Sequence, residues 1–189
     1  MGGVVYLGKM NAPLALTFLR ILCIPILVVV LMVDFKGQEI TAFGLFALAT
    51  FTDTLDGFWA RRKKQVTVLG QLLDPTADKL LIASVLICLV GSGAVPAWMA
   101  VIIVGREIAV TGFRAMASSK GIHIPASLLG KAKMILETVT ICILLLGEKN
   151  LGSLYSLSRL GLWLAIAAAL ISAAQYYMKF GRAVISGRS

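Results

Sequence analysis

The sequence predicts an all-α integral membrane protein with six transmembrane helices, and three observations carry this prediction. The 189 residues have a mean hydropathy of +0.91, and 14% of them are charged. So few polar residues cannot cover a soluble globule of this size, whereas a bundle of spanning helices needs few. The third observation is that apolar runs of bilayer length alternate with turn residues. We therefore expect one transmembrane domain over residues 1–189.

The first three expected spans end at turn or charged residues. The span near 13–33 is followed by Asp34-Phe35-Lys36-Gly37, and the span near 40–60 by Arg61-Arg62-Lys63-Lys64. The third, near 75–93, opens at Pro75 and closes at Gly91-Ser92-Gly93. Each run supplies roughly the twenty residues that a bilayer requires.

The last three expected spans are bounded in the same way. The span near 96–118 opens at Pro96, and the span near 127–147 follows Pro125 and ends at Gly147-Glu148-Lys149-Asn150. The sixth lies near 157–178. Cysteines 23, 88 and 142 are odd in number and lie inside apolar runs, so we expect free thiols rather than disulfides or zinc ligands. We expect no removable signal peptide and assign no site role to His123.

The distribution of lysine and arginine predicts the orientation. The opposite loops carry Lys36 and Lys149, whereas one set of helix ends carries Lys9, Arg61, Arg62, Lys63, Lys64, Lys120, Lys131, Lys133, Lys179, Arg182 and Arg188. By the positive-inside rule, both termini are cytoplasmic in a multi-pass protein of the cell (inner) membrane. The net charge of +9 is then a topology signal that also attracts anionic headgroups, and a nucleic-acid partner is not expected.

Charged residues also fall inside the expected spans, in the cytoplasmic half of the bilayer or near the middle of the bilayer. They are Arg20, Asp53, Asp56, Asp78, Lys79, Arg106, Glu107, Arg114 and Glu137. Charges in a membrane must face one another or water. We therefore expect a polar cavity that opens to the cytoplasm.

Four of the five aspartates lie within one short segment, at Asp53, Asp56, Asp74 and Asp78. Asp53, Asp56, Gly57 and Ala60 are spaced i, i+3, i+4 and i+7, which places them on one face of a helix. For the second pair a structural alternative exists, because Asp74 could cap a helix that begins at Pro75. Four carboxylates without histidine or cysteine suit Mg²⁺ or Mn²⁺, and two such ions are the usual clamp for displacement at phosphorus.

This segment resembles, at every defined position, the signature D-x2-D-G-x2-A-R-x7-8-G-x3-D-x3-D of the CDP-alcohol phosphatidyltransferase family. Other parts resemble its bacterial phosphatidylglycerophosphate synthase branch, namely Asn11-x-Pro13-x3-Thr17-x2-Arg20 with Pro25, Arg106-Glu107-Ile108-x-Val110-Thr111-Gly112-x-Arg114, and Gly130-Lys131-x-Lys133. Two positions depart from that branch, since Leu14 and Met134 stand where asparagine and threonine are expected.

The resemblance implies transfer of the phosphatidyl group of CDP-diacylglycerol to an alcohol, with release of CMP. It implies that Asp53, Asp56, Asp74 and Asp78 hold two divalent ions and that Asp78 is the general base. An ordinary aspartate is a weak base, so its surroundings would have to assist. Donor binding is implied for Gly57, Ala60, Arg61, Gly70, Asn11 and Thr17. The resemblance also implies a homodimer.

In this branch the acceptor is sn-glycerol 3-phosphate, and its phosphate requires cations. Arg106, Arg114 and Lys131 are the expected phosphate ligands, because arginine suits bidentate phosphate contact. The alternative is that Arg106 pairs with Glu107 or Glu137 while the other two reach lipid headgroups. Inositol phosphate, serine or a phospholipid as acceptor stays open. A divalent-cation transporter is a remote alternative, since acidic residues along the whole bilayer are not seen.

Overall fold

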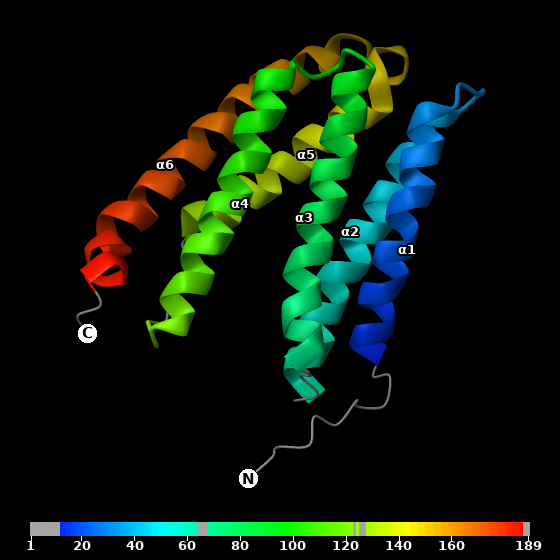
Figure 1. Cartoon of the computed structure of the whole chain (residues 1–189). Coiled ribbons are helices and arrows are strands. Elements are labelled where there is room, and N and C mark those ends of the chain that lie inside the picture. The colour runs from blue at the N-terminus through cyan, green and yellow to red at the C-terminus, as the bar shows by residue number, and fades with distance from the viewer. Residues whose placement is uncertain (1–11, 64–67, 123, 125–127, 187–189) are drawn as a thin grey trace. The chain divides into compact units, whose positions relative to one another are not determined.

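The computed structural model describes residues 12–63, 68–122, 124 and 128–186, and within these ranges it is helical with no strand (Figure 1). The helices are α1 (Ala12–Met32), α2 (Gln38–Lys63), α3 (Val68–Gly91), α4 (Ala97–Ser119), α5 (Leu128–Leu151) and α6 (Leu157–Ser186), with the short 3-10 helix η1 (Gly152–Ser156) before α6. The predicted all-α class is confirmed.

Helix α3 begins earlier than the sequence predicts. It starts at Val68, and Pro75 lies inside it. Position 74 is therefore within the helix, so the alternative in which Asp74 caps the N-terminus is wrong. A proline inside a helix removes one backbone hydrogen bond, and helices of membrane proteins tolerate this where neighbouring groups compensate. Sequence reasoning placed the start at Pro75 because proline favours that position.

The chain forms two compact units, residues 1–85 and 86–189, with the boundary inside α3. In the first unit, α1 and α2 pack side by side and are joined by a tight turn. Gly37 adopts φ 91°, the Gln38 amide donates to the Phe35 carbonyl over 3.1 Å, and the Gln38 side chain caps α1 by donating to the Leu31 carbonyl. A side chain other than glycine would be strained at that φ.

Buried residues of the first unit follow helical spacing. Ala42, Phe46 and Ala49 form one buried face of α2, at i, i+4 and i+7. In α3, the corresponding residues are Ala77, Leu81 and Val85, all inaccessible or nearly so. This spacing is typical of a helix that packs one stripe against its neighbours.

In the second unit, α6 packs against both α4 and α5. A buried stripe runs along each of these helices, with Ile103 and Phe113 in α4, Ile141 in α5, and Leu162 and Ala169 in α6 among its members. Helix α5 contains a break at Gly147, where φ is 71° and ψ is 165°, in agreement with the turn predicted there. The described cysteines, 23, 88 and 142, are free as predicted.

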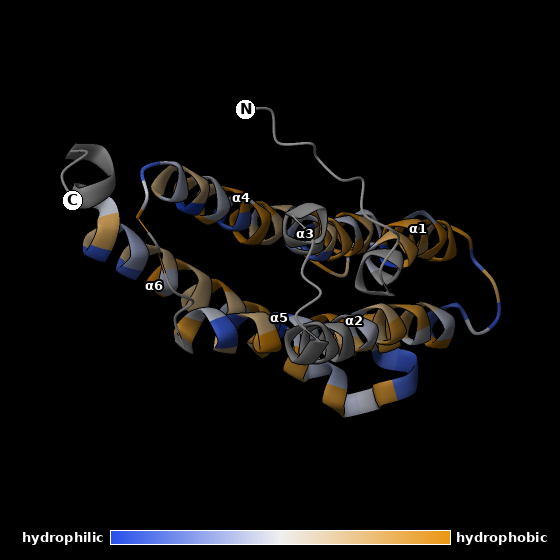
Figure 2. Cartoon of the chain, turned by 90° about the horizontal axis from the view of Figure 1, so that it is seen from below, coloured by the Kyte–Doolittle hydropathy of each residue, from blue (hydrophilic) through white to orange (hydrophobic). Residues whose placement is uncertain are grey.

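Large apolar side chains lie on the outside of both units, among them Leu22 and Val29 in α1, Val101 and Ile108 in α4, and Trp163 in α6. Figure 2 shows this apolar colour along the helices and hydrophilic colour at the turn between α1 and α2. Soluble monomers seldom expose so much contiguous apolar surface. By length and composition, the described residues contain one helical stretch, 129–181, that could cross a membrane. These features agree with an integral membrane protein.

Candidate active site

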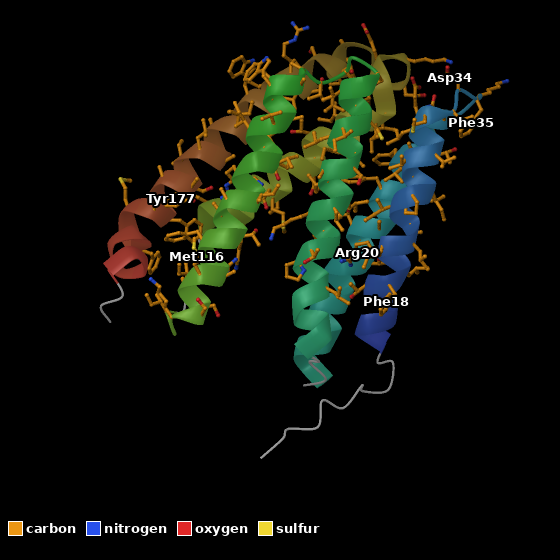
Figure 3. All side chains as sticks on the ribbon, viewed as in Figure 1. Phe18, Arg20, Asp34, Phe35, Met116 and Tyr177 are labelled. Atoms are coloured by element: carbon orange, nitrogen blue, oxygen red, sulfur yellow. The ribbon has the colours of Figure 1, made fainter. Side chains whose placement is uncertain are left out.

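In the first unit, a buried arginine joins three helices. Arg20 of α1 is 3% exposed, and its Nη1 donates to Asp78 Oδ1 of α3 over 2.8 Å. Its Nε donates to the Ala49 carbonyl of α2 over 3.3 Å. Figure 3 labels Arg20 on the side of α1 that faces α2 and α3. A buried guanidinium requires such partners, because an unpaired charge away from water costs several kcal/mol.

The local sequence explains why Arg20 is buried. Thr17, Arg20 and Leu27 lie on one face of α1, and all three are buried. The arginine thus occupies a position that an apolar residue would otherwise fill, and its polar head reaches groups on both neighbouring helices. Ala49 lies one turn before position 53 of α2, and Asp78 lies one turn after position 74 of α3. Arg20 therefore contacts both helices that carry the predicted metal ligands.

Most of the predicted metal and donor residues lie in helical backbone whose side chains fall outside the described part of the chain. Positions 53, 56, 57, 60 and 61 are in α2, and positions 70 and 74 are in α3. Asn11 and His123 lie outside the described residues altogether. In α2, positions 53, 56 and 60 continue the register of the buried residues 42, 46 and 49. The predicted ligand positions 53 and 56 therefore lie on the same face of α2 as the buried stripe.

Metal-ion chemistry can be tested against the donor types present. Among the described side chains, no three His, Cys, Asp or Glu residues lie close enough together to hold a metal ion. Of the four predicted ligands, these side chains include Asp78, whose side chain is 40% exposed while it accepts from Arg20. The full set of four aspartates consists of hard oxygen donors, which fit Mg²⁺ or Mn²⁺.

In the second unit, a cluster of charged side chains connects α4, α5 and α6. Glu107 Oε1 accepts from both Arg106 and Lys133, and Lys133 Nζ lies 2.6 Å from Glu137 Oε1. Arg106 also donates from Nη2 to Ser172 Oγ and from Nε to the Ala169 carbonyl, the latter over 3.2 Å. Lys133 and Glu137 are buried, at 3% and 5% exposure. The pairing of Arg106 with Glu107 is the alternative that the sequence left open.

The other two predicted phosphate ligands lie apart from this cluster. Arg114 is exposed on α4, two turns beyond Arg106, and its Nη2 donates to the Ile124 carbonyl over 3.3 Å. Lys131 is exposed on α5. Arg114 thereby holds the segment after α4, where Gly121 has φ 76° and the Ile122 amide donates back to the Ala117 carbonyl over 2.9 Å. This pattern is typical of a glycine-terminated helix end.

Sequence reasoning counted Lys133 toward the topology and the family resemblance but assigned no site role to Lys133 or Ser172, although both are central to the cluster. The spacing of Lys133 and Glu137 at i and i+4 on α5 was a usable signal for an ion pair. Ser172 gave no comparable signal, since the sequence does not show whether a serine in an alanine-rich helix is buried, exposed or bonded to another helix. It becomes recognisable through the register of Leu162, Ala165 and Ala169, which share its buried face.

Comparison with known proteins adds an independent observation. Residues 10–174 match the family model described as CDP-alcohol phosphatidyltransferase. A CDP-diacylglycerol–glycerol-3-phosphate 3-phosphatidyltransferase of Bacillus subtilis is 35% identical over 182 residues, which cover 89% of this chain and 94% of that protein. Its counterpart from Rickettsia felis is 34% identical over 169 residues, covering 88% and 93%. A probable phosphatidylglycerophosphate synthase of Mycobacterium tuberculosis is 37% identical over 134 residues, covering 69% and 64%.

Proposed function

This chain belongs to the CDP-alcohol phosphatidyltransferase family, and on that premise we propose that it transfers the phosphatidyl group of CDP-diacylglycerol to sn-glycerol 3-phosphate. The products are phosphatidylglycerophosphate and CMP. Relatives that align with nearly the whole chain are named for this reaction. The structural observation that carries the proposal is the buried Arg20, which connects Asp78 to the helix bearing Asp53 and Asp56.

The proposed metal ligands are Asp53, Asp56, Asp74 and Asp78, which would hold two ions of Mg²⁺ or Mn²⁺. The two helices that carry these residues are both contacted by Arg20. Bound divalent ions would neutralise the phosphate oxygens of the donor. Four carboxyl groups in one segment of a largely apolar chain are a costly arrangement that a bound cation would offset.

Asp78 is the proposed general base that accepts the proton of the acceptor hydroxyl. Its ion pair with Arg20 fixes the direction of Oδ1 toward α1. Its side chain is 40% exposed, so the carboxylate is accessible despite the buried partner. The acceptor oxygen would then attack the phosphorus next to diacylglycerol, and the bond to the CMP oxygen would break.

Donor binding is proposed for Asn11, Thr17, Gly57, Ala60, Arg61 and Gly70. Thr17 shares the buried face of α1 with Arg20 and lies one turn before it, which supports a place near the carboxylates. The small residues Gly57 and Ala60 would leave room for the nucleotide beside the α2 backbone.

Acceptor phosphate binding is proposed for Arg106, Arg114 and Lys131. Three of the five N–H donors of Arg106 have protein partners among the described residues, which leaves two for a phosphate. Arg114 and Lys131 are exposed and add positive charge on α4 and α5. Fork-shaped guanidinium groups suit bidentate contact with phosphate oxygens.

We also propose that the chain is one domain that crosses the cell (inner) membrane six times. In the first unit, positions 53, 56, 61, 74 and 78 lie in the halves of α2 and α3 that adjoin the connection between these helices. In the second unit, positions 114, 133 and 137 lie in the halves of α4 and α5 that adjoin their connection, and positions 106 and 107 lie near the middle of α4. Placing both connections and both termini in the cytoplasm satisfies the positive-inside rule, and the proposed polar cavity would then open to a soluble acceptor. The family resemblance supports a homodimer.

The proposal is tested with purified protein, CDP-diacylglycerol, Mg²⁺ and a panel of acceptors: glycerol 3-phosphate, inositol phosphate, serine and a phospholipid. We expect CMP release that depends on glycerol 3-phosphate. Release that depends on inositol phosphate alone would replace the acceptor, and no release with any acceptor would refute the enzyme assignment.

A further inference from the structure

We propose that Glu107 and Ser172 are positioning residues, which hold the guanidinium of Arg106 in the orientation that receives the phosphate of the acceptor. This inference rests on the proposed function, because it takes Arg106 as a phosphate ligand. Glu107 and Ser172 would not contact the acceptor. They would act through Arg106.

The first support is the number of anchors on one guanidinium. All three nitrogens of Arg106 have a protein partner: Nε the Ala169 carbonyl, Nη1 Glu107 and Nη2 Ser172. These partners come from two helices, α4 and α6, so the planar group is fixed at each of its nitrogens. The side chain retains 9% exposure. A long side chain held this way loses little further rotamer freedom when it binds a ligand.

The second support is the way Ser172 is itself oriented. Its hydroxyl donates to the Ala169 carbonyl over 3.1 Å, and its oxygen accepts from Arg106. The same carbonyl also accepts from Arg106 Nε. Ser172 is completely buried, so its hydroxyl cannot exchange these partners for bulk water. One turn of α6 therefore presents two acceptors in a fixed geometry to the edge of the guanidinium.

The third support is the balance of charge around Glu107. Its carboxylate is shared between Arg106 and Lys133, and Lys133 also pairs with Glu137 across one turn of α5. The two cations thus share the carboxylate of Glu107, and Lys133 also faces the carboxyl group of Glu137. A buried arginine without such a carboxylate would be costly. Glu107 stabilises the charge of Arg106, and among the described residues two of the five N–H donors of Arg106 have no protein partner and suit an incoming anion.

The register of the helices explains why this arrangement is rigid. Arg106 lies in the buried stripe of α4, between Ile103 and Val110, and Ser172 lies in that of α6, between Ala169 and Tyr176. Each polar group therefore lies, in helical register, between buried apolar residues of its own helix. Substrate-positioning groups supported in this way hold a ligand in a reactive geometry.

The test compares Glu107→Gln and Ser172→Ala with matched controls. Glu148→Gln changes an exposed glutamate at the other end of α5. Ser158→Ala removes another buried serine of α6 that donates to a carbonyl three residues back and that, among the described residues, accepts from no arginine. We expect Glu107→Gln and Ser172→Ala to raise the KM for glycerol 3-phosphate about tenfold. The KM for CDP-diacylglycerol and all constants of the controls should stay within about twofold of the wild type.

A double-mutant cycle separates positioning from a general structural effect. In an Arg106→Lys background the fork is gone, so Glu107→Gln should raise the KM for glycerol 3-phosphate by less than about twofold further. The inference would be overturned if the KM changes caused by Arg106→Lys and Glu107→Gln multiplied fully in the double variant. It would also be overturned if the KM for glycerol 3-phosphate were unchanged in Glu107→Gln and Ser172→Ala. If Glu107→Gln does not fold, the KM of Ser172→Ala decides the question. A wild-type protein without glycerol 3-phosphate-dependent CMP release would instead refute the proposed function.

Discussion

Arg20 and Asp78, which are far apart in the sequence, form a 2.8 Å ion pair between α1 and α3. The same guanidinium donates to the Ala49 carbonyl of α2, so one buried side chain links three helices. This placement ties the proposed general base to the helix that carries half of the proposed metal ligands. Its consequences for stability and for turnover can be measured separately.

Replacing Arg20 should destabilise the protein. Arg20→Met retains apolar volume but leaves Asp78 without this partner, and we expect the free energy of unfolding to fall by about 2 kcal/mol. Denaturant unfolding in detergent measures the change. Arg159→Met, an exposed arginine at the start of α6, is the control and should have little effect. The free energy of unfolding of the double variant Arg20→Met/Asp78→Asn is then compared with those of the two single variants. If the loss in the double variant equals the sum of the two single losses, the two residues are not coupled.

Asp78→Asn should abolish turnover and leave the fold intact. The amide oxygen can still accept from Arg20, but it cannot take the proton of the acceptor, so we expect kcat to fall by about 10³-fold or more. CMP release measures the rate, and circular dichroism checks the fold. Asp34→Asn, in the exposed turn between α1 and α2, should retain full activity. Turnover near that of the wild type in Asp78→Asn would remove Asp78 from the role of base.

Chelation should remove activity reversibly. Four aspartates favour Mg²⁺ or Mn²⁺, so exhaustive treatment with a chelator should stop CMP release and addition of either ion should restore it. Zinc should restore less, because the segment lacks histidine and cysteine. Full activity after chelation, with the metal content verified as negligible, would contradict the proposed site.

The contact between α5 and α6 should be sensitive to a single methyl group. A Cβ added at Gly161 would lie 3.0 Å from the methyl carbon of Thr140, and still closer to its hydroxyl. We expect Gly161→Ala to lower the free energy of unfolding by about 1–3 kcal/mol through overpacking. At Gly44 a Cβ meets nothing within 4 Å, so Gly44→Ala should be neutral or slightly stabilising. Equal thermal stability of the two variants would show that the helices separate easily at this position.

Composition and periodicity predicted the helices, because long apolar runs separated by turn residues favour helices in a chain this hydrophobic. They misplaced the start of α3, since Pro75 is a typical first residue of a helix but here lies inside one. They also identified Arg106 and Glu107 as a potential pair, which the structure contains.

The long-range partners could not be predicted in this way. Nothing in the sequence specifies that Arg20 meets Asp78 rather than another aspartate, because this depends on how three helices pack. Lys133 was passed over in favour of Lys131, although the spacing from Lys133 to Glu137 indicated an ion pair. The buried role of Ser172 required its register on α6 to be seen against α4.

In the proposed reaction, the acceptor hydroxyl attacks the phosphorus next to diacylglycerol. This attack is tested most directly with glycerol 3-phosphate that carries oxygen-18 in its terminal hydroxyl, followed by mass spectrometry of both products. We predict phosphatidylglycerophosphate that contains the heavy oxygen and CMP that does not. A nucleotide product that contains the label, or a labelled acceptor that never enters the lipid, would contradict attack at this phosphorus.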